Sequence, residues 1–164
     1  MSTINGLPAH PLLVHFIVVL TPATAVLAIV CAIWPAARRR FVWLLLPTAL
    51  VVLVLTPLTV RAGRSLAEKF GNSEVLRTHM NLGETMIWFS IALAVAAASV
   101  TAVHVAEHRS KALKPVVVWG IAALTIAVGV AVCVQTYRIG DSGSRAVWGG
   151  TAMALELPAS PAGS

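Results

Sequence analysis

Four long apolar runs constrain this chain more than any other feature of its sequence. They cover residues 12–34, 41–60, 84–106 and 115–137, and each reaches the length of about 20 residues that a helix needs to cross a bilayer. The runs are hydrophobic nearly all round, so they lack the polar face of a helix in a soluble bundle. The sequence therefore predicts an all-α fold, an integral membrane four-helix bundle.

The composition supports a membrane protein and argues against nucleic-acid binding. Hydrophobic residues make up 58% of the 164 residues and charged residues only 11%, which is far from the balance of a soluble domain. The net charge of +6 comes from Lys and Arg residues that cluster between the apolar runs. This distribution is typical of membrane topology signals. We therefore expect the lipid bilayer as a partner and no nucleic acid.

The positive residues also predict the orientation of the chain. Segments 35–40 and 107–114 carry six of the 12 Lys and Arg residues, whereas segment 1–11 carries none. Loops rich in Lys and Arg stay in the cytoplasm, so we expect a multi-pass protein of the cell (plasma) membrane with both termini outside. The middle connection, 61–80, also carries positive residues, but glutamates accompany them and the segment is long enough to translocate.

The connection between the second and third runs is too polar to span a membrane. Apolar residues recur in it at helical spacing on either side of Gly71-Asn72, so we expect a short interfacial helix on the outer surface, with a plain solvated loop as the alternative. The chain then forms a single membrane domain over residues 1–157. Residues 158–164 form a disordered tail with the sequence PASPAGS.

Small residues predict that the third and fourth spans pack closely against their neighbours, because small faces let helices approach each other in lipid. A compact bundle is expected, and a homo-oligomer stays open. The small residues include Ala96, Ala97, Ala98, Gly120, Ala122, Ala123, Ala127 and Gly129.

Two histidine sites open apolar runs at the same predicted depth. His10 precedes Pro11, a favourable first residue of a helix, so His15 lies roughly 6 Å further into the membrane. His79 opens the third run from the same side, and Gly83 follows one turn later on the same face, which leaves room beside the imidazole. Histidines placed in this way suit haem iron or a divalent metal.

Three interpretations of these histidines stay open. In the first, His15 and His79 are the axial ligands of one b-type haem in an apolar slot between helices. In the second, His10, His15 and His79 hold copper or zinc. In the third, no cofactor is bound and the imidazoles lie at the membrane interface, bonded to the backbone. No catalytic motif stands out, so the sequence leaves open whether the protein is an enzyme.

Two further histidines, His104 and His108, fall near the inner end of the third span. His104 lies about 37 Å along a helix from His79, so the two cannot share one site. No neighbouring span offers an inner histidine to complete a second haem, and we expect both residues to be interfacial. Glu84, on the same side as His79, either orients a histidine or faces solvent.

The polar segment after the fourth span, RIGDSGSRAVWGG, is expected to leave the helix near Gly140. In one interpretation the segment folds back over the outer mouth of the bundle. Arg138 or Asp141 then meets a haem propionate, a quinone headgroup or a partner. In the other, Gly140 is a helix C-cap and Asp141 starts a turn.

Three pieces of sequence, LPAHPLLVHF, THMNLGE and YRIGDSGSRAVWG, occur in this order around the four spans. In this respect the chain resembles bacterial membrane proteins of domain-of-unknown-function family 2231, although Ile17 stands where members commonly have proline. Some members are joined to a Rieske-type iron–sulfur domain, which implies redox chemistry at the outer face. The residues carried over from the resemblance are His10, His15, His79, Gly83, Arg138, Asp141 and Trp148.

Two functions follow as expectations. The first is a membrane redox subunit with one haem b near the outer face, exchanging electrons with the quinone pool or with a Rieske-type or cytochrome partner. The second is a non-enzymatic membrane subunit or anchor whose histidines are structural or bind copper or zinc.

Overall fold

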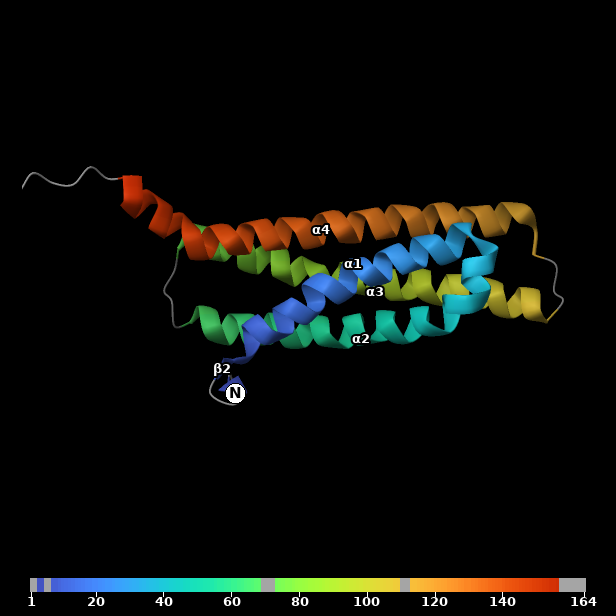
Figure 1. Ribbon diagram of the computed structural model, residues 1–164, viewed down its shortest axis with the longest axis horizontal. Helices are drawn as coiled ribbons and strands as arrows, with labels where there is room; N and C mark the ends of the chain where they lie inside the picture. Colours follow the sequence, from blue (N-terminus) through green and yellow to red (C-terminus); the bar gives the residue numbers. More distant parts are fainter. Residues whose placement is uncertain (1–2, 5–6, 69–72, 110–112, 157–164) are drawn as a thin grey trace, which may run out of the picture.

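The computed structural model describes residues 3–4, 7–68, 73–109 and 113–156. Each of its four helices is long and apolar enough to cross a membrane, so the predicted all-α membrane bundle is confirmed (Figure 1). The helices are α1 (Ala9–Ile33), α2 (Pro35–Ala67), α3 (Glu74–His108) and α4 (Pro115–Glu156).

A small hairpin precedes the bundle. Strands β1 (Thr3–Ile4) and β2 (Leu7–Pro8) have two residues each and pair antiparallel, with Thr3 opposite Pro8. The hairpin leads directly into α1, which begins at Ala9.

The helices α1 and α3 lie diagonally across the bundle, and each packs against both α2 and α4. Figure 1 shows α1 inclined to the other three helices. Its first turn touches α2, where His10 is bonded to Thr59. Further along, Ile29 lies against Gly129 of α4, where an added Cβ would come within 2.7 Å of it. We call the end where α1 and α3 begin the N-terminal end, and the opposite end the basic end.

The centre of the bundle combines small side chains with larger apolar ones, and Leu45, Val52 and Leu93 are buried there. Of the small residues expected to pack between helices, Ala96, Ala97, Ala122 and Gly129 are buried, whereas Ala98, Gly120, Ala123 and Ala127 are exposed. Large apolar side chains cover the outside, and Phe16 and Trp88 are 67% and 72% exposed. Surfaces of this kind are stable where lipid, and not water, surrounds them.

The predicted connection over residues 35–40 is wrong, because these residues form the first turns of α2. A single residue, Trp34, links α1 to α2 in an extended conformation with φ −119° and ψ 101°. The residue before a proline is restricted to such geometry, and Pro35 favours the start of a helix. The chain therefore reverses direction without a loop.

The predicted interfacial helix is also wrong within the described residues. Most residues of the polar connection belong to the two helices that flank it, because α2 continues to Ala67 and α3 already begins at Glu74. Ser73 caps α3 by accepting a hydrogen bond from the Leu76 amide at 3.2 Å, which is the usual role of an N-cap serine. Gly71-Asn72, the expected helix break, lies outside the described residues.

The predicted helix end at Gly140 is wrong as well, because α4 continues through this residue to Glu156. Local side-chain bonds support the helix in this stretch. Ser144 donates to the Asp141 carbonyl at 2.8 Å, and Arg145 pairs with the Asp141 carboxylate at 3.0 Å. The segment therefore extends the fourth helix and does not fold back over the bundle. The predicted disordered tail, 158–164, lies outside the described residues.

Arg38 ties the two diagonal helices together at the basic end. Its side chain is only 4% exposed and pairs with Glu107 of α3 at 2.7 Å. The same guanidinium donates to the carbonyls of Cys31 and Ala32 at the end of α1, each at 3.3 Å. A cation in this position also interacts favourably with the negative end of the α1 dipole.

Replacing Arg38 should therefore destabilise the bundle. We expect Arg38→Leu to lower the free energy of unfolding by about 2–4 kcal/mol, because it leaves buried carbonyls and a glutamate without their donor. The exposed neighbour Arg39 is the matched control, and Arg39→Leu should change stability by less than about 0.5 kcal/mol. Unfolding in a denaturing detergent, followed by circular dichroism, measures both. Equal effects of the two variants would contradict the role given to Arg38.

Candidate functional site

The structure brings His10 and His79 together at the N-terminal end. His10 lies in the first turn of α1 and His79 in the second turn of α3, on diagonal helices. The two side chains lie close enough to influence each other electrostatically. His15 lies about 140° around α1 from His10, and its side chain is exposed. His10 is therefore a further candidate to pair with His79, and the pairing of His15 with His79 expected from the sequence stays a prediction.

The ring of His10 is fixed by α2. Its Nδ1 lies 3.1 Å from the carbonyl oxygen of Thr59. A carbonyl only accepts hydrogen bonds, so Nδ1 carries the proton and donates it, and Nε2 keeps a free lone pair. The ring also lies close against Gly63, where an added Cβ would be 2.9 Å from Cε1 of His10. Only a glycine lets the imidazole reach this carbonyl without a shift.

The ring of His79 is fixed in the same way by α4. Its Nδ1 lies 3.0 Å from Oγ of Ser142. Ser142 gives its own proton to the carbonyl of Ile139 at 2.9 Å, so it accepts the proton of His79 Nδ1, and Nε2 again keeps its lone pair. A Cβ added to Gly143 would lie 3.1 Å from Cε1 of His79.

The two histidines thus occupy equivalent half-sites, which we define as a histidine lying on a glycine of the following helix. In the first half-site the ring bonds the carbonyl of Thr59, four residues before Gly63. In the second it bonds Oγ of Ser142, the residue before Gly143, and Ser142 in turn donates to the carbonyl of Ile139. The hairpins α1–α2 and α3–α4 each supply one half-site. Sequence reasoning missed Gly63 and Thr59, because nothing in the sequence joins them to a histidine some 50 residues earlier.

Of the other predicted cofactor residues, Gly83 has open space beside it, since an added Cβ would meet nothing within 4 Å. The glycine against the His79 ring is Gly143. Arg138 is exposed on α4. Glu84 pairs with Arg64 of α2 at 2.7 Å, so this acid joins two helices and does not orient a histidine.

The predicted three-histidine metal site is not assembled. Among the residues that the structure describes, no group of three or more His, Cys, Asp and Glu side chains could hold a metal ion. His10 and His79 approach each other from α1 and α3, whereas His15 lies on another face of α1.

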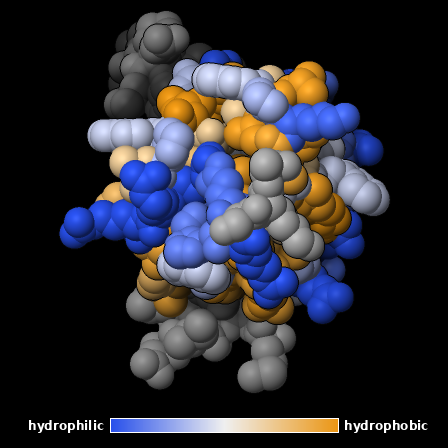
Figure 2. Space-filling view, turned by 90° about the vertical axis from the view of Figure 1, so that its right-hand side faces the viewer, coloured by the Kyte–Doolittle hydropathy of each residue, from blue (hydrophilic) through white to orange (hydrophobic). Residues whose placement is uncertain are grey.

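His104 lies inside the basic end, although the sequence predicted an interfacial position. It is 1% exposed, and its ring packs edge-on against Trp43 and His108, at centroid distances of 5.7 and 5.0 Å. Neither ring nitrogen has a hydrogen-bond partner within the described part of the protein. The helix α3 continues one turn beyond His104 to His108, which places His104 below the surface. Figure 2 shows hydrophilic residues gathered over this end.

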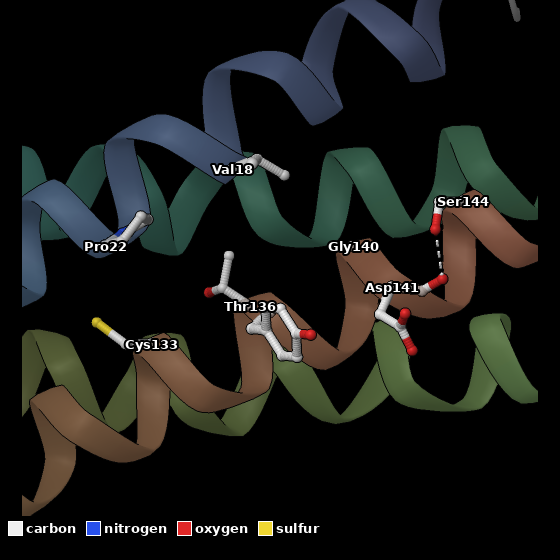
Figure 3. A pocket seen from close by; sticks show the side chains of 8 residues that line it. Val18, Pro22, Cys133, Thr136, Gly140, Asp141 and Ser144 are labelled. Carbon is white, nitrogen blue, oxygen red and sulfur yellow. Dashed lines mark hydrogen bonds between the residues drawn. The ribbon is translucent and has the colours of Figure 1, made fainter.

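A cavity of about 490 Å³, wide open to the surface of the bundle, lies between α1 and α4. Figure 3 shows Val18 and Pro22 on its α1 side, facing Cys133 and Thr136 of α4. Tyr137, Gly140, Asp141 and Ser144 complete the lining. His15 is one turn from Val18 on the same side of α1, by the helical period.

The glycines of the two half-sites can be tested by adding single methyl groups. We expect Gly83→Ala to raise the free energy of unfolding by about 1 kcal/mol, because alanine is the better helix former and its Cβ meets nothing. Gly63→Ala and Gly143→Ala should not show this increase in stability. In each variant the added methyl group displaces the imidazole of His10 or His79 from its hydrogen-bond partner. Thermal unfolding of the four proteins in one detergent measures this. Equal gains for all three variants would contradict the packing of the histidines.

Comparison with known proteins agrees with this architecture. A family model described as "Predicted membrane protein (DUF2231)" matches residues 6–154. No curated protein and no solved structure matches the chain. Because the family model covers most of the sequence and both half-sites, the chain belongs to the predicted membrane protein family DUF2231.

Proposed function

We propose that the protein is a membrane redox subunit that holds one b-type haem at the N-terminal end, with His10 and His79 as axial ligands. One geometric feature supports the proposal: Nδ1 of each imidazole lies within hydrogen-bond distance of an acceptor, the Thr59 carbonyl at 3.1 Å and Ser142 Oγ at 3.0 Å, so each ring can donate Nδ1–H and present Nε2 to a ligand. Histidines that bind metals almost always donate their other ring nitrogen to a carbonyl or a similar acceptor, which fixes the tautomer and raises the basicity of the ligand.

The number of ligands favours haem over zinc. A structural zinc ion takes four protein ligands and a catalytic one takes three, whereas no group of three candidate ligands occurs within the described residues. Haem iron needs only two axial ligands from the protein. His10 and His79 come from diagonal helices, and bundle cofactors are commonly held by side chains that project inward from facing helices.

The chain's own residues have separate roles in this proposal. Thr59 and Ser142 orient the two rings, and Gly63 and Gly143 let the rings lie close to the neighbouring helices. Arg138, exposed on α4, is the proposed partner of a haem propionate. A haem with two imidazole ligands supplies one-electron transfer when bound. The proposed electron partner is a quinone, a cytochrome or a Rieske-type protein.

The haem proposal predicts a specific spectrum. Purified protein from haem-replete cells should show the bands of a low-spin b-type haem, which sharpen on reduction. His10→Ala and His79→Ala should each abolish or convert these bands. His15→Ala and His108→Ala are the matched controls and should leave them unchanged.

Three results would overturn parts of this assignment. A spectrum lost in His15→Ala but kept in His10→Ala would restore the pairing expected from the sequence. Colourless protein that contains copper or zinc would replace haem with a metal ion. Colourless protein without any metal would mean that the histidines have only a structural role and that the protein is a non-enzymatic membrane subunit or anchor.

We also infer that the basic end faces the cytoplasm and the N-terminal end faces outward. Arg39, Arg40, Arg109 and Lys114 are exposed at the basic end, and hydrophilic residues gather there in Figure 2. Positive residues flanking membrane helices remain on the cytoplasmic side.

A reporter that is active only in the cytoplasm tests this orientation. Fused after Ser164 it should be inactive, and inserted between Arg109 and Lys114 it should be active, because these sites flank opposite ends of α4. The reverse pattern would place the histidine pair on the cytoplasmic side.

A further inference from the structure

The cavity between α1 and α4 presents hydrogen-bond acceptors on an otherwise apolar wall. On the α1 side, Pro22 has no N–H to donate to the carbonyl of Val18, which is its partner in an uninterrupted helix. Both residues line the cavity. The carbonyl of Val18 therefore lacks its usual helical donor.

The hydroxyl groups on the α4 side have already used their protons. Thr136 donates to the carbonyl of Val132 at 2.9 Å, and Ser144 donates to the carbonyl of Asp141 at 2.8 Å, as the dashed line in Figure 3 shows. Each oxygen can then only accept further bonds. The carboxylate of Asp141 accepts as well, and one of its oxygens is bonded to Arg145.

The donors that the lining side chains offer are few. They are the hydroxyl of Tyr137, an exposed residue, and the weakly donating thiol of Cys133. An acceptor facing an apolar cavity without a donor is costly in a membrane, because no water can replace the missing bond. The wall is therefore complementary to a ligand that brings a hydrogen-bond donor on an apolar body.

From these contacts we propose that the α1–α4 cavity binds the hydroxyl-bearing head of a lipid-soluble phenol or alcohol. Its volume, about 490 Å³, lies within the usual range of small-molecule sites. Gly140 leaves the α4 side open, since an added Cβ there would meet nothing within 4 Å. The cavity lies between two membrane-spanning helices, so its ligand enters from the bilayer. This site is separate from the histidine pair and does not depend on the haem proposal.

Two probes that differ in one methyl group test the need for a donor. 4-Decylphenol carries the hydroxyl, and 4-decylanisole has the same apolar body without the donor. Titration calorimetry of the full chain in detergent, corrected for empty micelles, should show one saturable site for the phenol. The anisole should bind at least tenfold more weakly, as expected for about 1.4 kcal/mol lost with one hydrogen bond. 1-Dodecanol as a third probe distinguishes an aliphatic alcohol from a phenol.

Two glycines of α4 provide matched variants for the location of the site. Gly140 lines the cavity and Gly120 does not, and neither has an atom within 4 Å of an added Cβ. Gly140→Leu should weaken phenol binding at least tenfold, while Gly120→Leu should leave it unchanged. Pro22→Ala returns an N–H to the Val18 carbonyl, and it should weaken the phenol several-fold without affecting the anisole.

The proposal fails in three cases. Equal affinity for phenol and anisole would mean that only apolar partition is measured. Unchanged binding in Gly140→Leu would move the ligand to another site. The absence of saturable binding by both the phenol and the alcohol would show that the cavity accepts an ordinary lipid chain.

Discussion

The constraint on which this structure depends is that polar groups inside a bilayer must find their partners within the protein. Most of them do so along their own helix, as Thr56 and Thr125 show by donating to the carbonyl four residues earlier. Within the described residues, side-chain bonds between helices lie toward the two ends, and they include Gln135 of α4, which donates to the Leu82 carbonyl of α3 at 3.2 Å. Arg38 joins α1 and α3 at the basic end, and the imidazoles of His10 and His79 join neighbouring helices at the other. The apolar middle is packed with leucine, valine and alanine side chains.

The same constraint makes buried polar groups without a partner notable exceptions. Both ring nitrogens of His104 and the hydroxyls of Thr21 and Thr24 are buried without a partner in the described part of the chain. Each such group costs about 1–3 kcal/mol. The two histidines at the N-terminal end differ from these groups. Each ring has a hydrogen-bond partner at Nδ1, and its Nε2 is available to bind a ligand. An imidazole of this kind is held in place and still has one nitrogen free to bind.

Much of the fold follows from the sequence, because the length of an apolar run is enough to identify a membrane helix. The helix ends were harder to predict. At Pro35 the chain turns within one residue, and at Gly140 helical side-chain bonds continue α4 through residues that favour turns. The cofactor-binding residues expected from the sequence stay a prediction. His10 and His15 lie at similar depths but point about 140° apart around α1, so depth alone does not choose between them. The packing of α1 on α2 places the ring of His10 against Gly63.

The tautomers of His10 and His79 test the account most directly, because they decide whether two ligand lone pairs meet at one end of the bundle. Nitrogen-15 NMR of the imidazoles, in protein prepared without haem or added metal, distinguishes the two ring nitrogens. The account predicts that both histidines carry their proton on Nδ1 and leave Nε2 unprotonated at neutral pH. Protons on Nε2, or the rapid exchange between tautomers that free imidazole shows, would contradict it.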